Sequence, residues 1–164
     1  MGSYSTRVRY GLRLLVRLAL QGSTHHLSIG DIAVEEGVSV KYLEQIVSLL
    51  KPLGILTSVR GARGGYILQC DPSEITMDKV FKSLGGLKYS TPCFVDATSC
   101  ERIEVCTTRP FWQDFDAYMR RYLEKVTLAE IVAKAPRGGV EFSLNFSCAS
   151  EEQPELTKAD SASR

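Results

Sequence analysis

Residues 55–69 read ILTSVRGARGGYILQ, in which two short β-branched or aromatic runs flank a glycine-rich centre at residues 61–65. Glycine adopts the positive φ angles of tight turns without steric cost, so this pattern predicts a two-stranded β-hairpin. Arg60 and Arg63 would project from the hairpin near its tip. Because arginines in such a place suit DNA phosphates or a narrow minor groove, the hairpin has the character of a DNA-binding wing.

The segment before the hairpin contains two helical patterns separated by a short turn. Ser28 and Ser39 are placed to cap the two helices, and Gly37 supplies a left-handed residue between them. Pro52 and Gly54 end the second helix. The apolar stripe of this helix consists of Leu43, Ile46, Val47 and Leu50. Two helices joined by a short glycine-containing turn predict a helix-turn-helix.

Residues 5–21 predict a further amphipathic helix, which ends near Gly22. Its apolar face is expected to carry Val8, Leu12, Leu15, Val16 and Ala19. Arg9, Arg13 and Arg17 recur every four residues elsewhere on the helix. The predicted fold class is therefore mainly α with a small β-hairpin wing, a winged helix-turn-helix domain over residues 1–87.

Composition and charge limit the class of protein. The chain has 164 residues, enough for one ordinary domain or for a small domain with an oligomerisation arm. No run approaches the roughly 18–20 apolar residues that span a bilayer, and no signal-peptide pattern is present, so we expect a cytoplasmic protein without membrane contact. Residues 1–69 contain eight Lys or Arg and four Asp or Glu, hence +4, whereas residues 70–164 contain twelve and fifteen, hence −3. The basic excess therefore lies with the helix-turn-helix.

The second helix of the helix-turn-helix has polar side chains opposite its apolar stripe, where a recognition helix contacts base edges. The candidates for DNA contact on this helix are Ser39, Lys41, Tyr42, Glu44 and Gln45. A carboxylate near phosphates is repelled unless it accepts from cytosine N4, a contact worth about 1–3 kcal/mol of base discrimination. The helices alone also fit a helical protein-interaction domain, and it is the arginines of the hairpin that favour DNA.

Hydrophobic spacing divides the chain beyond the hairpin into helices and a loop. The expected helices cover residues 76–84, 110–126 and 128–135, and the expected loop covers residues 88–108. One side of the longest helix carries Phe111, Phe115, Tyr118, Met119 and Tyr122, and Trp112 is a further aromatic side chain of this helix. A chain of this size has little else to cover these side chains, so we expect an antiparallel dimerisation helix within residues 109–135, beginning with Pro110 as its first residue. Residues 136–164 are expected to form a flexible tail, after a short strand that fits residues 140–146.

Three of the five cysteines, Cys93, Cys100 and Cys106, fall within the expected loop. Their spacing is neither that of a zinc ribbon nor that of a bacterial ferredoxin, but a loop still allows three thiolates to converge on one metal centre. Spacing alone also leaves open unrelated cytosolic cysteines, a structural zinc module and an enzymatic nucleophile. Because His25 and His26 are distant from the three cysteines in sequence, we expect no enzyme.

Three motifs carry a family resemblance. They are Arg9-Tyr10-x-Leu-Arg, Tyr42-Leu-Glu-Gln-Ile and, most specific, Ser58-Val-Arg-Gly-Ala-Arg-Gly-Gly-Tyr-Ile-Leu. Over residues 6–135 the chain resembles the Rrf-type family of bacterial regulators, which includes IscR, NsrR and CymR. The resemblance implies a homodimeric winged-helix regulator of transcription that binds pseudo-palindromic double-stranded DNA operators. By position it implies that Glu44 reads bases and that Arg60 contacts DNA, whereas DNA contact by Arg63 is expected from its charge alone.

The three cysteines resemble the cluster-binding loop of IscR-like and NsrR-like members of that family. The resemblance implies an iron-sulfur cluster, of two-iron or four-iron type, held by Cys93, Cys100, Cys106 and a fourth ligand that is not cysteine. The sequence departs from the pattern at this fourth ligand. Arg109 and Arg9 stand where these members have a ligating histidine or the partner subunit's aspartate, and neither can ligate. The remaining candidates are a partner residue, an exogenous ligand, or Asp96, Glu101 or Glu104.

The predicted function is a homodimeric transcription regulator that senses iron, redox state or nitric oxide through this cluster. We expect the cysteine loop to pack between the dimerisation helix and the winged domain. A cluster would then shift the population of recognition-helix arrangements by its differential affinity for them. The alternative is a regulator of the same fold with thiol-based or metabolite-based sensing and no cluster, as in CymR-like members.

Overall fold

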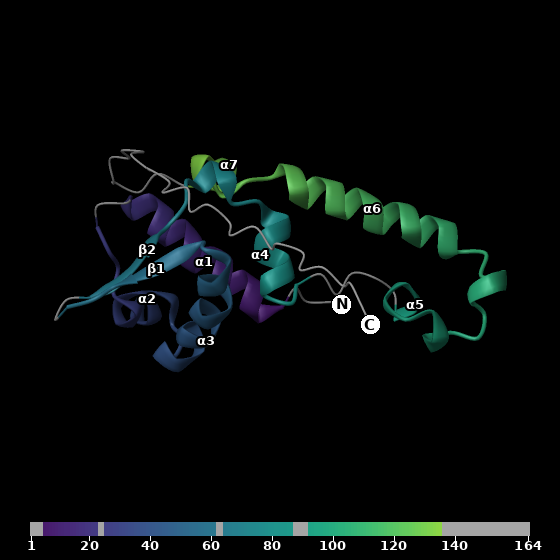
Figure 1. Cartoon of the computed structure of the whole chain (residues 1–164), viewed down its shortest axis with the longest axis horizontal. Helices are drawn as coiled ribbons and strands as arrows, with labels where there is room; N and C mark the ends of the chain where they lie inside the picture. The colour runs from purple at the N-terminus through teal and green to yellow at the C-terminus, as the bar shows by residue number, and fades with distance from the viewer. Residues whose placement is uncertain (1–4, 23–24, 62–63, 87–91, 136–164) are drawn as a thin grey trace, which may run out of the picture.

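The protein is a winged helical domain from which one long helix extends as an arm (Figure 1). The structure is a computed structural model that describes residues 5–22, 25–61, 64–86 and 92–135. The predictions made for Arg63, for a strand at residues 140–146 and for a flexible tail lie outside these residues. None of the helices in the described ranges is long and apolar enough to cross a lipid bilayer.

Three helices form the body of the winged domain, and their capping follows the sequence prediction. They are α1 (Thr6–Gln21), α2 (Ile29–Glu36) and α3 (Val40–Leu50). The Ser28 hydroxyl accepts from the backbone N–H of Gly30 at 3.1 Å, and the Ser39 hydroxyl accepts from that of Tyr42 at 3.2 Å. Gly37 ends α2 with a φ of 65°, a left-handed conformation that glycine adopts without strain. The predicted helix-turn-helix is confirmed.

An antiparallel hairpin follows α3 and forms the wing. It consists of β1 (Leu56–Val59) and β2 (Gly65–Leu68), reached through the 3-10 turn η1 (Lys51–Leu53). The backbone of Tyr66 also exchanges two hydrogen bonds with Leu27, at 3.1 and 2.9 Å. A Cβ atom at Gly65 would collide with the Leu27 carbonyl, so this close approach requires glycine. Gly65 thus joins the wing to the segment before α2.

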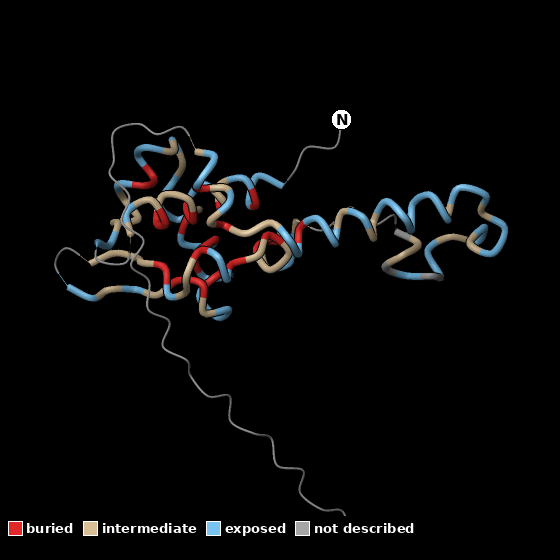
Figure 2. The backbone as a smooth tube through the Cα atoms, turned by 90° about the horizontal axis from the view of Figure 1, so that it is seen from above, coloured by how far each residue is buried: buried red, intermediate tan, exposed pale blue. Residues whose placement is uncertain are grey.

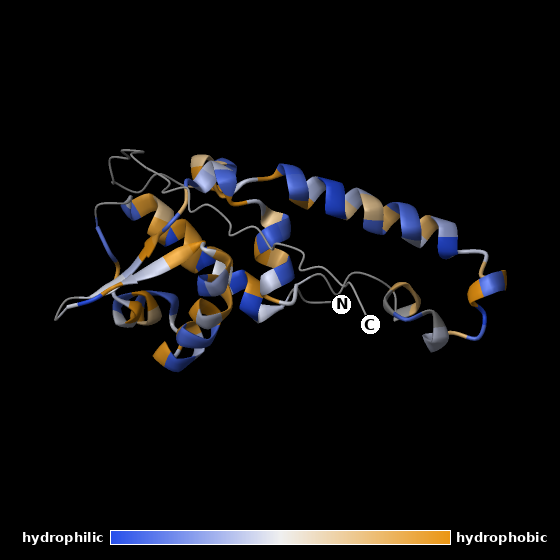
Figure 3. Cartoon of the chain, viewed as in Figure 1, coloured by the Kyte–Doolittle hydropathy of each residue, from blue (hydrophilic) through white to orange (hydrophobic). Residues whose placement is uncertain are grey.

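The core surrounds α1, and hydrophobic residues of α1, α3 and the hairpin gather in this part of the molecule (Figure 3). Its buried residues are Val8, Gly11, Leu14, Leu15, Leu18 and Ala19. Leu14 and Leu18 are buried, although they were not among the residues predicted to face the core. Leu12 and Val16 were predicted to face the core but are only half-buried. A single apolar face was the wrong expectation because α1 contacts α3, α4, α7 and β2. The half-buried side chains of Leu12 and Val16 line a groove beside α1.

The arm leaves the domain where the C-terminal elements pack together. These elements are η2 (Pro72–Glu74), α4 (Met77–Ser83), α6 (Arg109–Lys125) and α7 (Leu128–Ala133). Backbone N–H groups of Met77 and Leu128 donate to Val126 and Ile75 at 2.8 and 2.9 Å, which fixes α7 beside the start of α4. In α6 itself Leu123 is the buried residue, so most of this helix extends away from the domain (Figure 2).

The cysteine segment, residues 92–108, consists of short helical turns instead of the predicted loop. They are α5 (Pro92–Val95), η3 (Ala97–Ser99) and η4 (Ile103–Val105). Each turn has three or four residues, too few for a hydrophobic period to be recognised in the sequence. The arm helix begins at Arg109, so Pro110 is its second residue and not its first as predicted.

Candidate nucleic-acid interface and cysteine segment

The outer face of α3 carries most of the side chains predicted to contact DNA. Ser39, Lys41, Glu44 and Gln45 are exposed, whereas the apolar stripe of α3 is buried. The Ser39 oxygen caps the helix, and its O–H is still able to donate outward. This face therefore offers donors from Lys41 and an acceptor from Glu44, the two kinds of group that base edges pair with.

Tyr42 lies at the edge of this polar face and is half-buried. Its ring meets that of Tyr10 edge-on, with the ring centroids 5.9 Å apart. The Tyr42 hydroxyl is buried and has no hydrogen-bond partner within the described part of the chain. Packing against α1 withdraws this polar atom in the single chain, and the contact of Tyr42 with DNA stays a prediction. Tyrosine has an apolar ring and a polar tip, so residue type alone did not distinguish the two orientations.

The wing presents one of the two predicted arginines. Arg60 follows β1 directly and is exposed. It therefore stands where the chain leaves the paired strands of the hairpin. Arg63 lies outside the described residues, so its contact with DNA stays a prediction.

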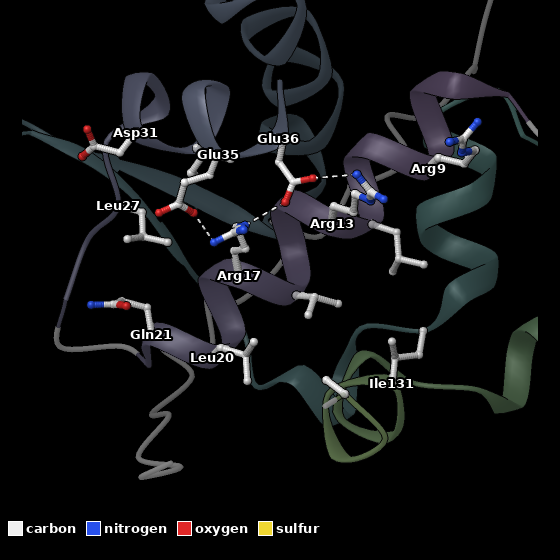
Figure 4. Close-up of a pocket in the computed structure, with 14 residues that line it drawn as sticks. Arg9, Arg13, Arg17, Leu20, Gln21, Leu27, Asp31, Glu35, Glu36 and Ile131 are labelled. Carbon is white, nitrogen blue, oxygen red and sulfur yellow. Dashed lines mark hydrogen bonds and ion pairs between the residues drawn. The ribbon is translucent and has the colours of Figure 1, made fainter. Parts of the chain in front are cut away.

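Ion pairs join α1 to α2 across a groove of about 780 Å³ (Figure 4). The Glu36 carboxylate accepts from Arg13 Nη1 and from Arg17 Nε, both at 2.8 Å. Arg17 also pairs with Glu35. The apolar side chains that line the groove are Leu12, Val16, Leu20, Leu27, Ile32 and Ile131. These ion pairs hold the first helix of the helix-turn-helix against α1.

The electrostatics of this network favour its charged form. Burial raises the pKa of Glu36, but hydrogen bonds from Arg17 and Arg13 outweigh that effect and leave the pKa lowered. The hydrogen bond to Glu36 likewise raises the pKa of Arg17. This network was not predicted, although arginines four residues apart on α1 and adjacent glutamates at the end of α2 indicate it.

The cysteine segment lies at the outer end of α6, away from the winged domain of its own chain (Figures 1 and 2). We expected it to pack between the arm and the winged domain. This expectation is wrong for a single chain, because the length of α6 separates the two. In the described part of the single chain, the cysteine segment therefore lies apart from the winged domain.

Within the segment, Cys93, Cys100 and Cys106 are each half-buried. The Cys106 sulfur lies 3.5 Å from the Thr108 hydroxyl oxygen. Hydrogen bonds from the Thr108 hydroxyl and backbone N–H, and then the nearby Arg109, lower the pKa of the Cys106 thiol. In the described ranges no three His, Cys, Asp or Glu side chains gather as a metal-binding group. As placed, the three thiols do not fit an iron-sulfur cluster unless the segment closes.

Arg109 and Asp96, which were considered in connection with the fourth ligand, make other contacts in this chain. Arg109 Nη1 donates to the carbonyl oxygen of Ile103 at 3.2 Å, so Arg109 braces the turn before Cys106. Asp96 accepts from the backbone N–H and the hydroxyl of Thr98, at 2.9 and 2.7 Å. The Asp96 carboxylate caps η3, and this capping uses one of the two carboxylate oxygens.

The arm carries a row of exposed aromatic side chains. Phe111, Trp112, Phe115, Tyr118 and Tyr122 are between 40% and 62% exposed. The rings of Phe111, Trp112 and Phe115 contact one another, with centroids 5.0 to 6.4 Å apart. Exposed apolar patches of this kind are typical of protein interfaces.

A helix-turn-helix, a two-stranded wing and a projecting arm define the class of winged-helix transcription regulators. The chain belongs to the Rrf2 family, described as an iron-dependent transcriptional regulator, which matches residues 4–134. This family and fold are those that the motifs of the first helix, the recognition helix and the wing predict.

Two relatives in sequence and two solved structures illustrate what this chain is similar to. It is 38% identical over 131 residues to the protein rrf2 of Nitratidesulfovibrio vulgaris, covering 80% of this chain and 87% of that protein. It is 31% identical over 128 residues to the transcriptional regulator IscR of Klebsiella pneumoniae, covering 78% of each. The structure of CymR, the global cysteine regulator of B. subtilis, aligns with a TM-score of 0.68 at 30% identity, over 83% of this chain and 100% of that one. T. potens IscR aligns with a TM-score of 0.65 at 28% identity, over 84% and 94%.

Proposed function

We propose that this chain binds double-stranded DNA as a homodimer, with α3 in the major groove and the wing against the sugar-phosphate backbone. The observation that carries the proposal is the division of α3 into a buried apolar stripe and an exposed polar face. Lys41, Glu44 and Gln45 would contact base edges from that face, and Arg60 would contact the backbone. The basic excess of residues 1–69 supports the same orientation.

The arm is proposed to form the dimer by antiparallel pairing of α6 with its copy. Pairing would cover the aromatic row and give the two-fold symmetry that a pseudo-palindromic operator requires. In an antiparallel pair the start of one α6 lies beside the end of the other. Each cysteine segment would then reach the winged domain of the partner, which is the contact that a single chain lacks.

Selection of duplexes from a random DNA library by the full-length chain tests DNA binding. We expect enrichment of a two-fold symmetric motif whose half-sites are about one helical turn apart, roughly 34–36 Å. Footprinting on the selected duplex should show protection of both half-sites. Recovery of no motif, with binding no stronger than that of an unrelated acidic protein, would overturn the proposal.

The cysteine segment is proposed as the sensory input, through an iron-sulfur cluster that responds to iron, redox state or nitric oxide. Support comes from the spacing of Cys93, Cys100 and Cys106 and from the iron-dependent description of the family. Relatives named IscR are consistent with it. Because the three thiols are not gathered in the single chain, cluster binding would require the segment to close, for example on pairing with a second copy.

Thiol-based sensing without a cluster is the second candidate. The observation that favours it is the lowered pKa of Cys106, which raises its thiolate fraction on a half-buried sulfur. The similarity to CymR is consistent with this input.

An absorption spectrum of anaerobically purified protein, with iron and sulfide content, separates the two inputs. Cluster sensing predicts a coloured sample with bound iron and sulfide, which is lost in a Cys100→Ser variant. A colourless sample that takes up neither element after reconstitution would reject the cluster. A redox-dependent change in DNA affinity in that colourless sample would then support the thiol.

A further inference from the structure

Lys51 and Ser58 form a polar pair where the recognition helix meets the wing. Lys51 is the first residue of η1, directly after α3, and Ser58 belongs to β1. The Lys51 Nζ atom donates to the Ser58 hydroxyl oxygen at 3.2 Å, and both residues are exposed. Neither residue was predicted to contact DNA.

The pair lies on the side of the hairpin that faces the helical body. Leu56 and Ser58 alternate along β1 and therefore share one face, and Arg60 is the residue after the strand. Leu56 is buried in the core, so this face of β1 turns toward the helices. Ser58 lies on the same face nearer the hairpin tip, where it bonds to Lys51. Lys51 and Ser58 thus form a polar connection from the end of α3 to the wing, two residues before Arg60 in the chain.

The position of Lys51 along α3 suits the edge of a major groove. Gln45 and Lys51 are six residues apart, which corresponds to about 9 Å along a helix axis. Half the width of the major groove is about 6 Å. If Glu44 and Gln45 lie over the base edges, Lys51 is therefore at the wall of the groove, where the phosphates are.

The charge of Lys51 is available for such a contact. Cations elsewhere in the chain, such as Arg17, Lys82 and Arg120, are paired with carboxylates. No ion pair of Lys51 is present in the part of the chain that the structure describes. An ammonium group has three N–H donors, and the bond to Ser58 uses one of them. The other donors and the Ser58 O–H can reach the oxygens of one phosphate.

We propose that Lys51 binds a backbone phosphate of double-stranded DNA and that Ser58 orients its ammonium group. The pair would set the angle between the recognition helix and the wing on the DNA. The inference rests on the proposed DNA-binding function, which it deepens by adding a backbone contact between the base-reading residues and the wing.

The test is the dependence of affinity on salt, measured with the selected duplex and the full-length chain. Neutralising one phosphate contributes a slope of about −0.9 in log K against log salt, so Lys51→Met should flatten the slope of a dimer by about 1.8. Lys51→Arg keeps the charge and should keep the slope. Ser58→Ala should lower affinity about threefold with the slope nearly unchanged, because only orientation is lost.

Two further variants separate failure of this inference from failure of the proposed function. Lys134→Met removes an exposed lysine at the end of α7 and should leave the slope as in the wild type. Arg60→Ala should flatten it. A slope unchanged in Lys51→Met but flattened in Arg60→Ala would overturn the role of Lys51 alone. Absence of binding by the wild-type chain would instead overturn the DNA-binding function. Circular dichroism of each variant checks that the exposed substitution leaves the fold intact.

Discussion

Glu44 is the acidic residue on the exposed face of the recognition helix, and its effect should be on specificity. Glu44→Ala should reduce the ratio of specific to non-specific affinity by about 1–3 kcal/mol, because the carboxylate pairs with a base edge. Affinity for unrelated duplexes should hold or rise, since a negative charge near phosphates is removed. Selection from a random library with each protein measures this, with Glu124→Ala on the arm as the control. An identical motif for wild type and Glu44→Ala would contradict the assignment.

Cys106 owes its lowered pKa chiefly to Thr108, so Thr108→Val should make the thiol less reactive. In reduced, metal-free protein near pH 7.5, alkylation of Cys106 by iodoacetamide should slow by about threefold, because a smaller fraction is thiolate. Peptide mass spectrometry gives the rate at each cysteine across a pH series. Thr107→Val is the matched control, since Thr107 is an exposed neighbour. Equal rates in both variants would show that Thr108 does not stabilise the thiolate.

At the scale of single residues, the sequence predicts the orientation of a side chain correctly where its chemistry favours only one environment, water or core. Lys41, Glu44 and Gln45 were predicted to be exposed, because burying a charge or an amide without a partner is costly, and they are exposed. Tyr42 satisfies either environment, so its inward orientation depended on Tyr10, a contact across 32 positions of chain. The hydrogen bond from Lys51 to Ser58 was likewise not predictable, because it depends on how the hairpin packs against the end of α3.

The ion pairs between α1 and α2 should stabilise the domain in a pH-dependent way. Glu36→Gln should lower the free energy of unfolding at pH 7 by about 1 kcal/mol, because two arginines lose a charged acceptor whose side chain is only 10% exposed. The pKa of Glu36 is lowered on folding, so this contribution is complete above the usual glutamate pKa of about 4.3. It is lost as the pH falls through the lowered pKa.

Chemical denaturation at several pH values measures this effect. The difference between wild type and Glu36→Gln should be constant near neutrality and shrink below about pH 4. Glu44→Gln is the control, because its carboxylate is exposed and makes no ion pair in the described part of the chain. A difference that stays constant down to pH 3 would show that the Glu36 charge does not contribute.

At the scale of elements, periodicity located the helices but not how each one is covered. Leu12 and Val16 were predicted to face the core, yet they line the groove, because α7, α3, α4 and the wing contact α1 at positions that no local pattern encodes. In the cysteine segment the elements themselves were not predicted. Its turns are shorter than one hydrophobic period, so regular structure there was not predictable.

At the scale of the whole molecule, the proposed dimer would cover the arm, whose aromatic row is exposed in the described part of the single chain. Along α6 the buried residue is Leu123, while the aromatic row faces solvent. Phe115→Asp places a charge in the middle of that row, and we expect it to convert a dimer into a monomer at micromolar concentration. A monomer engages one half-site, so affinity for the two-fold operator should fall by about 10²–10⁴ as the effective concentration of the second domain is lost.

Sedimentation velocity and a titration with the selected duplex test this together. Gln113→Asp is the matched control, because Gln113 lies two residues from Phe111 and Phe115 and so faces the opposite side of α6. It introduces the same charge and should remain dimeric with wild-type affinity. If Phe115→Asp also sediments as a dimer, the aromatic row is not the interface. The cysteine segment would then lack a route to a winged domain, because its own chain holds it at the outer end of α6.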